Sequence, residues 1–536
     1  MTKPPLSPFE IIHKRASTRL ENFFHRCENV ESALFLDPGL DIIISRIVHP
    51  DLIKSCFKKV FTYQSNREFF DYDKILIFTT GENNHLAQYV DLLSSTEKPP
   101  RSIVVVFTNR FSFIARQYFE MRGFLHKIST EELRLPAWIL DPDYATIELQ
   151  FAFSDLYIEN GGRCIQSLSN IIKSIPSYDY YSNVYMIGQA SIEIGKALPT
   201  NFHSAWTHIL IFDRRVDSVT PFLTAMSYEA IVAELVGMTY GFSHTPKNDL
   251  VLFSDQDPNI AHIRSMPYDE AAKEASSIYQ TFKEDITKEK EGSIEKMRSL
   301  EKNVKNATIT DHVNIISEIP ELIAEDPNFN KNLNHEMDCY LNHEPDINFI
   351  KDSIALSPTW HTPVRLLALY CQTTNKIPQD LDEIRTMIID RFGLEALAAL
   401  WSLEEANIIK SDMKPTYWYT IMKKFELFNK TPEKKSEKPY DGYTPLVVRL
   451  LQKIIKKQWN QCHLILEQLK IPFRVDANRC SDATRVLCVF VGGATYGELA
   501  ALRSSKGELL VHIDILTTQA VSPKKVLDQF AGLEFT

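Results

Sequence analysis

The sequence has no apolar run long enough to cross a membrane. Its longest apolar runs, at 103–107 and 397–401, are far shorter than the roughly 20 residues that a spanning helix needs. The first 15 residues are polar and contain three prolines, so they lack the charged-then-apolar layout of a secretion signal. No long basic run exists and the net charge is -10, which argues against nucleic acid or anionic lipid as partners. We therefore expect a soluble, cytoplasmic protein.

Motifs of zinc, redox and nucleotide chemistry are also missing. The 8 cysteines form no Cys-x-x-Cys pair, and no Gly-x-Ser-x-Gly sequence occurs. The glycines of 188–196 and of 492–497 have the wrong spacing for a phosphate or dinucleotide loop. His335-Glu336 begins like a zinc-protease helix, but Cys339 stands in place of the second histidine. The sequence favours a protein that is not an enzyme and has no cofactor and no metal.

Apolar patterning predicts two α/β regions. In the first, a short buried strand at 33–36 and β-branched runs at 75–80 and 103–108 alternate with amphipathic stretches such as 85–93. Short buried strands separated by helices imply a parallel sheet covered on both faces. A second α/β pattern follows, with strands at 184–187 and 208–212 and helices at 157–172 and 191–198.

Strand signals then nearly vanish between 230 and 457, where helical periodicity dominates, and they return at 486–491 and 511–516 around a helix at 496–504. Two strands alone make a poor sheet, so the late pair should complete the second sheet. We predict an α/β plus α fold with two open, mostly parallel sheets, the second of which is interrupted by a large helical insertion. Residues 429–440, rich in Lys, Glu, Pro and Ser, are the clearest linker.

A segment dense in Lys and Glu, 283–305, lies inside the insertion. Its sparse apolar seam consists of Ile294, Met297, Leu300 and Val304. Gly292 and a loop-like stretch at 306–311 offer bends. We predict a projecting helical hairpin that presents this seam to another helix. A solvated helix face without a partner is the alternative.

Two carboxylates follow the strand at 208–212. Asp213 and Asp217 stand where α/β proteins often place chemistry, and paired carboxylates can hold magnesium or move protons. Arg214 and Arg215 lie beside them, which favours a structural cluster of ion pairs instead.

Residues 209–229 resemble the signature of the SM (Sec/Munc) family, the clasp-like chaperones of SNARE-mediated membrane fusion. The signature residues here are Asp213, Arg214, Asp217, Thr220, Pro221, Tyr228 and Glu229. Phe222 departs from the family, which usually has Leu after Thr-Pro, and Asp441 replaces a small residue. Segments 252–264, 440–450 and 489–503 resemble the family in the same order. Residues 363–371 and 498–503 are most similar to the vacuolar protein sorting-associated protein 33 branch.

The resemblance implies three domains in an arch that binds a SNARE helix and aligns SNARE motifs, with Asp213, Arg214 and Asp217 fixing a hinge. We predict that the hairpin contacts SNARE helices through its apolar seam, Ile294, Met297, Leu300 and Val304. The predicted parts are an α/β domain at 1–135, a second α/β domain at 136–230 and 440–536, a helical part with the hairpin at 231–355, and a helical part at 356–439. The branch implies a subunit of the HOPS and CORVET tethering complexes, peripheral on endosomal and vacuolar or lysosomal membranes.

In that branch a helical-solenoid subunit would be the stable partner. We predict Tyr440, Tyr443 and Pro445 as its interface, with simple packing between segments as the alternative. Three other functions stay open. They are an SM protein of another trafficking step, secretory or ER to Golgi, a nucleotide-dependent α/β enzyme, and a scaffold that has lost SNARE binding and only holds a partner subunit.

Overall fold

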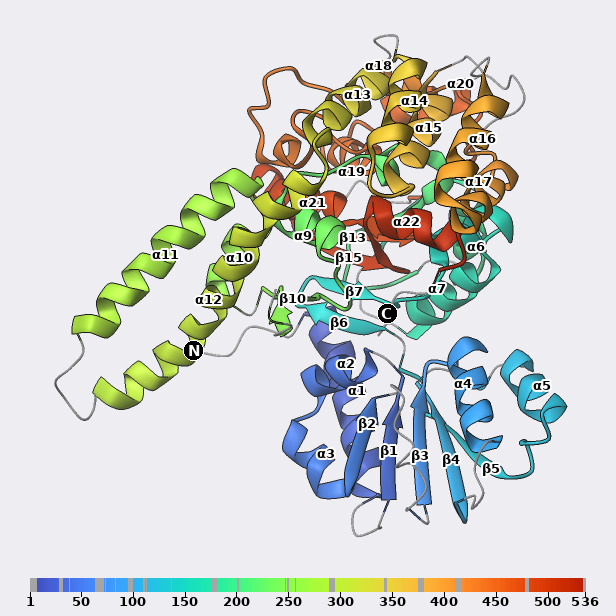
Figure 1. Cartoon of the computed structure of the whole chain (residues 1–536), viewed down its shortest axis with the longest axis vertical. Coiled ribbons are helices and arrows are strands. Elements are labelled where there is room, and N and C mark those ends of the chain that lie inside the picture. Colours follow the sequence, from blue (N-terminus) through green and yellow to red (C-terminus); the bar gives the residue numbers. More distant parts are fainter. Residues whose placement is uncertain are drawn as a thin grey trace. The chain divides into compact units, whose positions relative to one another are not determined.

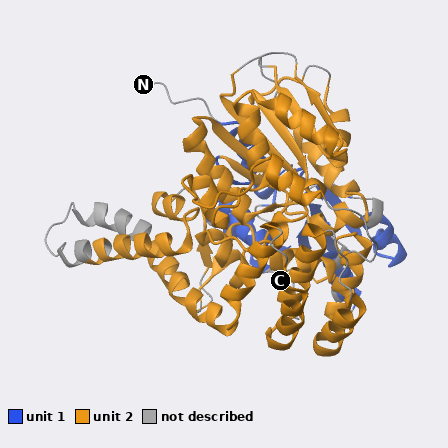
Figure 2. Cartoon of the chain, turned by 90° about the horizontal axis from the view of Figure 1, so that it is seen from above, with its two compact units in different colours: residues 1–142, 536 blue, residues 143–535 orange. Residues whose placement is uncertain are grey.

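The chain divides into two compact units, unit 1 with residues 1–142 and unit 2 with residues 143–535 (Figure 2). The structure is a computed structural model that describes residues 7–27, 32–37, 39–62, 72, 74–81, 83–94, 100–108, 111, 113–135, 137–174, 181–199, 202–245, 247, 250–255, 257–288, 295–341, 345–374, 380–409, 417–477 and 482–533. The finer division into three domains, and their arch, stay predictions.

Unit 1 contains a five-stranded parallel sheet in the order β2-β1-β3-β4-β5 (Figure 1). Its strands are β1 (Ser32–Leu36), β2 (Lys59–Thr62), β3 (Lys74–Thr79), β4 (Ser102–Phe107) and β5 (Ile128–Glu132). Its helices are α1 (Pro8–His25), α2 (Leu40–Ile47), α3 (Pro50–Cys56), α4 (Asn83–Ser94) and α5 (Phe113–Met121). Neighbouring residues of a strand face opposite sides. Phe78 therefore meets Phe23 and Phe24 of α1, whereas Ile77 belongs to the apolar cluster that includes residues of α4 and α5.

The strands predicted in this unit are β1, β3 and β4, the central ones. β2 and β5 were not predicted, because they are the two edge strands and carry few apolar residues.

Unit 2 is built on a sheet whose strands within the unit have the order β12-β8-β9-β13-β15-β7. These strands are β7 (Tyr144–Thr146), β8 (Asn183–Ile187), β9 (His208–Asp213), β12 (Phe473–Asp476), β13 (Arg485–Val491) and β15 (His512–Thr517). The strand β6 (Trp138–Asp141) belongs to the residues of unit 1. β13 pairs in parallel with both β9 and β15, and β12 pairs antiparallel with β8. Late strands thus complete a sheet begun early in the chain, which confirms the predicted interruption of the second sheet.

Helices make up most of the segment between β9 and β12. They are α9 (Tyr228–Leu235), α10 (Pro258–Ile263), α11 (Tyr268–Lys288), α12 (Glu295–Glu325), α13 (Phe329–Leu341), α14 (Ile347–Leu356), α15 (His361–Thr373), α16 (Leu381–Phe392), α17 (Leu394–Glu405), α18 (Trp418–Lys424), α19 (Leu446–Ile455), α20 (Trp459–Gln468) and the 3-10 helices η2 (Arg214–Val216), η3 (Thr220–Phe222) and η4 (Lys435–Tyr440). None of the helices in the described ranges combines the length and apolarity needed to span a bilayer.

The remaining elements of unit 2 accompany its sheet. The helices are α6 (Ala152–Ile158), α7 (Gly162–Ser174), α8 (Gln189–Lys196), α21 (Tyr496–Leu509) and α22 (Pro523–Phe530). Two short strand pairs are β10 (Phe242–His244) with β11 (Leu250–Leu252), and β14 (Ala494–Thr495) with β16 (Ala520–Val521). The α/β plus α fold class is confirmed.

Three local predictions are wrong. The helix predicted at 157–172 is split into α6 and α7, because Asn160 and Gly161 both adopt positive φ. Residues 306–311 are not a loop but part of the continuous helix α12. The linker at 429–440 is packed: η4 lies in it, and Glu437 is 1% exposed and bonded to Arg449 and Asn429.

A buried carboxylate joins the ends of β1 and β3 in unit 1. Asp37 follows β1 and is 0% exposed. It accepts hydrogen bonds from the hydroxyl of Thr79, the last residue of β3, at 2.8 Å and from the backbone N–H of Thr80 at 2.7 Å. It also accepts one from the hydroxyl of Tyr89 in α4 at 3.0 Å. Nδ1 of His85 lies 3.1 Å away. This carboxylate therefore fixes the carboxyl end of the sheet to α4.

We expect Asp37→Ala to destabilise unit 1 by about 3 kcal/mol, since it leaves several buried donors without an acceptor. Tyr89→Phe, which removes a single donor, should cost about 1 kcal/mol. Hydrogen exchange of residues 74–94 under increasing urea measures both. Equal effects of the two variants would contradict a central role for the carboxylate.

Candidate functional site

Asp213, the last residue of β9, contacts the turn that joins β8 to the start of α8. Its carboxylate accepts hydrogen bonds from the backbone N–H of Ala190 at 2.8 Å and from the guanidinium of Arg215 at 2.9 and 3.1 Å. Gly188 has a φ of +93°, and a Cβ there would lie 2.3 Å from Cβ of Asp213. At this helix N-terminus, the place that a phosphate takes in a phosphate loop is therefore filled by the chain's own carboxylate.

Arg214 forms a buried ion pair with Glu498 of α21. The two side chains are 1% and 0% exposed, and their charged atoms are 2.8 Å apart. The guanidinium lies over the rings of Phe212 and Phe490, at 5.4 and 5.5 Å from their centroids. Glu498 also forms the capping box of α21 with Thr495. Burial raises the pKa of Glu498, and the positive charge of Arg214 opposes that shift.

Asp217 caps a turn instead of pairing with an arginine. It accepts hydrogen bonds from the backbone N–H of Val219 and Thr220, at 3.2 and 3.0 Å, and from the Thr220 hydroxyl at 2.6 Å. Pro221 stands in the first turn of η3, where its fixed φ suits a helix start. Within the described ranges no Lys or Arg makes an ion pair with Asp217. The predicted cluster is thus right for Asp213 with Arg215 and wrong for Asp217.

Glu229 and Tyr228 join α9 to the helices around it. Glu229 pairs with Arg264, whose Nε lies 3.1 Å from one carboxylate oxygen, and with Arg503 of α21 at 2.7 Å. Tyr228 is fully buried, and its hydroxyl lies 2.8 Å from Nδ1 of His312 in α12. Burial lowers the pKa of His312 from 6.5 to about 4. The contacts of the signature residues therefore reach the base of the α11–α12 pair.

The three residues predicted as a partner interface are buried inside unit 2. Tyr440 is 5% exposed, and its hydroxyl lies 2.8 Å from that of Thr495. Tyr443 is 0% exposed and lies 2.6 Å from the Thr220 hydroxyl, and Pro445 is buried at the start of α19. These side chains show the alternative arrangement, packing between segments of the chain. A partner contact through them would first require this part of the core to open.

A cavity of about 360 Å³ adjoins Asp213. Polar groups of Asp213, Arg215 and Gln372 line one part of it, and Trp418 and Ile421 of α18 line another. Asp213 is already neutralised by Arg215, so this cavity has no free carboxylate for a metal or for proton transfer among these residues.

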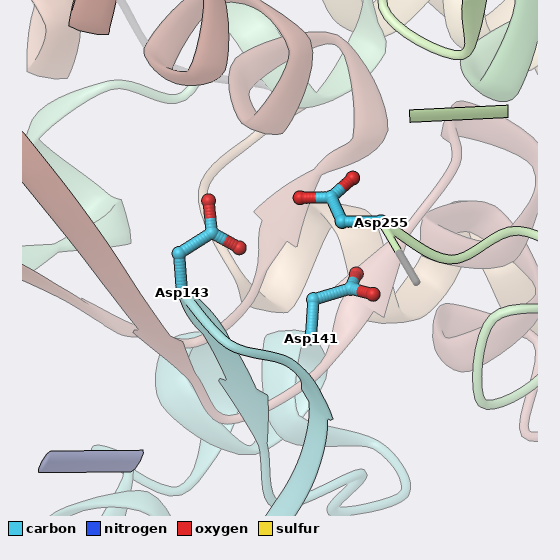
Figure 3. A group of neighbouring side chains, drawn as sticks. All are labelled: Asp141, Asp143 and Asp255. Atoms are coloured by element: carbon cyan, nitrogen blue, oxygen red, sulfur yellow. The ribbon is translucent and has the colours of Figure 1, made fainter. Parts of the chain in front are cut away.

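Figure 3 shows the acidic residues Asp141, Asp143 and Asp255. Within unit 2, Asp143 forms an ion pair with Lys506, and Asp255 lies 2.9 Å from Arg264. Because Asp143 and Asp255 already have cationic partners, the group gives no reason to assign a metal.

The α11–α12 pair runs away from the body of unit 2, as both views show (Figures 1 and 2). At its base, the hydroxyl of Tyr268 in α11 donates to the carbonyl of Ile316 in α12. Of the predicted seam, Ile294 lies outside the described residues. Met297, Leu300 and Val304 belong to α12, but their side chains lie outside the description as well. Contact of this seam with a SNARE stays a prediction.

Comparison with known proteins identifies the family. Residues 32–529 match the Sec1 family. The chain belongs to the Sec1 family. Members of this family, the SM proteins, are non-enzymatic regulators of SNAREs in vesicle trafficking. The resemblance seen in the sequence is therefore confirmed.

Relatives and solved structures match this Sec1-family chain over 80% to 99% of its length. It is 24% identical over 493 residues to the vacuolar protein-sorting-associated protein 33 homolog of Arabidopsis thaliana, covering 80% of this chain and 81% of that one. It is 22% identical to vacuolar protein sorting-associated protein 33A of Rattus norvegicus, covering 92% of both. The SM protein Vps45 in complex with the Qa SNARE Tlg2 has a TM-score of 0.61 at 18% identity, over 97% of this chain and 98% of that one. Sly1p with an N-terminal peptide of Sed5p has a TM-score of 0.61 at 14% identity, over 99% of each chain. At these identities the two structures show the fold alone.

Sequence reasoning missed three partners of the signature residues, which are Glu498, Arg264 and His312. For Glu498 a signal existed, since Thr495-x-x-Glu498 before an apolar helix is a capping box. Arg264 and His312 carry no local signal, because their partners lie 35 and 84 residues away in the sequence.

The buried ion pair leads to a stability prediction. Glu498→Gln removes the charge that Arg214 faces, so it should destabilise unit 2 by about 3–5 kcal/mol. The double variant Arg214→Met with Glu498→Gln should recover part of this loss, because no unpaired charge remains. Urea unfolding of the three proteins measures the coupling. Additive losses in the double variant would show that the two charges do not interact.

His312 should make unit 2 less stable in acid. Its folded pKa of about 4 lies below the unfolded value of 6.5, so the unfolded chain takes up the proton first as pH falls. Lowering the pH from about 7 to about 5 should cost about 2 kcal/mol through this residue alone. His312→Gln should remove that part of the pH dependence in urea unfolding. An unchanged slope in the variant would contradict the assignment.

Proposed function

We propose that this chain binds SNARE proteins and templates or stabilises their assembly for membrane fusion. It acts by binding, as the SM subunit of a HOPS/CORVET-type tethering complex on endosomal and vacuolar or lysosomal membranes, which it reaches through its partners. The observation that carries this proposal is the α11–α12 pair, which leaves unit 2 at a base held by signature residues.

A helix pair of this kind suits a template. α12 has 31 residues, which gives it a length of about 46 Å. SNARE motifs are heptad helices with apolar layers, so a firmly held helix can align one in register by helix-to-helix docking. Names of relatives support the branch, because the vacuolar sorting 33 proteins match over most of this chain.

The α11–α12 pair gives a direct test. Replacing residues 283–305 by a short Gly-Ser bridge should leave the fold intact, because the buried Ile309 and His312 remain. We expect this deletion to weaken the binding of purified SNARE motifs about tenfold, which corresponds to about 1.4 kcal/mol. Isothermal titration at low and high salt measures the affinity. The affinity of the unchanged chain should fall as the salt concentration rises.

A narrower variant separates the seam from the helix pair as a whole. Met297→Asp with Leu300→Asp should weaken the same binding, whereas Met121→Asp, at a residue of unit 1 that is 86% exposed, should not. If the deletion variant is folded and binds SNARE motifs with unchanged affinity, the segment is a solvated helix pair without a partner.

Membership of a tethering complex needs a separate experiment. Purification of the tagged chain from its own cells should bring down a helical-solenoid subunit in equimolar amount. Recovery of SNAREs of a secretory or ER to Golgi step without such a subunit would assign the chain to another trafficking step.

A further inference from the structure

Helix α1 of unit 1 carries a row of cations along an open cavity, the α1 groove, of about 450 Å³. One half-buried residue and four exposed ones line the groove, Ile11, Lys14, Arg15, Thr18 and Arg19. Its volume lies within the range of small-molecule sites, about 300–1,000 Å³. The groove belongs to unit 1, whereas the signature residues belong to unit 2.

The positive charges of the groove have no acidic partner in the described part of the chain. Neither Lys14 nor Arg15 forms an ion pair there, and the guanidinium of Arg19 donates to a backbone carbonyl at 2.7 Å. Residues 11–20 contain no Asp or Glu. Further along the chain, by contrast, Arg26 pairs with Glu131. The groove is therefore a local site of positive charge on a chain whose net charge is -10.

The spacing of the cations favours phosphate as the group that neutralises them. Arg15 and Arg19 stand at i and i+4, so their Cβ atoms lie about 6 Å apart on one face of the helix, where like charges repel each other. An anion between them would remove that repulsion, and each guanidinium can give two hydrogen bonds to one phosphate. Lys14 lies beside this pair and can meet a second phosphate. The Thr18 hydroxyl is bonded to the backbone carbonyl of Lys14 at 2.9 Å and adds no charge.

We propose that the α1 groove binds a compact ligand with two or more phosphate groups, of the chemistry of an inositol phosphate. The cations at 14–19 cover about 8 Å of helix, which suits a ligand of this size better than an extended acidic peptide. A free inositol phosphate and the headgroup of a phosphoinositide lipid carry the same chemistry. The site does not depend on the proposed binding of SNAREs.

Calorimetric titration of the full chain with inositol trisphosphate tests the site. The unchanged chain should bind the trisphosphate, with an affinity that falls as the salt concentration rises. The double variant Arg15→Ala with Arg19→Ala should bind at least tenfold more weakly. Arg19→Lys alone should have a smaller effect, because it keeps the charge and loses only the paired donors of the guanidinium.

Arg116→Ala with Arg122→Ala is the matched control. It removes the same charge from exposed residues in and just after α5, which lies on the opposite face of the unit 1 sheet from α1. This variant should bind the trisphosphate as the unchanged chain does. All of these variants replace exposed residues, so circular dichroism should show them folded.

Vesicle flotation distinguishes the two sources of the ligand. If the chain floats with phosphatidylcholine vesicles that contain phosphatidylinositol bisphosphate, and the double variant at Arg15 and Arg19 does not, the ligand is a lipid headgroup. If the chain binds the soluble trisphosphate and does not float, the ligand is a free inositol phosphate.

The proposal is overturned if neither probe binds, if the folded double variant at Arg15 and Arg19 keeps its affinity, or if the control at Arg116 and Arg122 loses as much. It is also overturned if phosphatidylserine vesicles or a polyglutamate peptide bind the α1 groove as tightly as the inositol probes do. In that case the groove attracts any anionic surface and does not select clustered phosphates.

Discussion

The buried pair between Arg214 and Glu498 ties together residues that are 284 positions apart in the chain. Neither charge is exposed, so each is tolerable only beside the other. The pair sets where the end of β9 meets the start of α21. Hydrogen bonds then continue from Thr495 to Tyr440 and from Thr220 to Tyr443, so the return segment of the chain is held at the same point.

Further polar contacts connect this region to the helices around it. Glu229 binds an arginine from the end of α10 and another from α21, and Tyr228 meets His312 in α12. A template for another helix needs a base that does not yield, because a small displacement at the base becomes large along a long helix. The family signature is therefore better understood as a support for the α11–α12 pair than as a reactive site, which agrees with the membership of a non-enzymatic family.

Local patterns in the sequence predicted the central strands and the interrupted second sheet, because buried parallel strands are short, apolar and β-branched. Local patterns gave wrong predictions where the deciding contact joins residues that are far apart in the sequence. Arg214 was expected beside Asp213 and Asp217, yet consecutive residues at a strand end face opposite sides, so Arg214 meets Glu498 while Asp213 meets Arg215. The segment at 429–440 was predicted as a linker because its composition is polar. Its composition does not show that Glu437 and Ser436 have partners in α19 and α21.

The pairing of β9 with β13 has a consequence for synthesis. Thr207 and Arg485 at the start of these strands are 278 residues apart, and a ribosome adds about 5–20 residues per second. The early half of the second sheet therefore waits at least about 14 seconds, with the apolar edge of β9 uncovered, while the helical insertion is made. Helices form and pair locally during that interval, but the sheet closes only when β13 emerges. Such a nascent chain is a natural client for chaperones, and its yield in a foreign host should depend on them more than its final stability does.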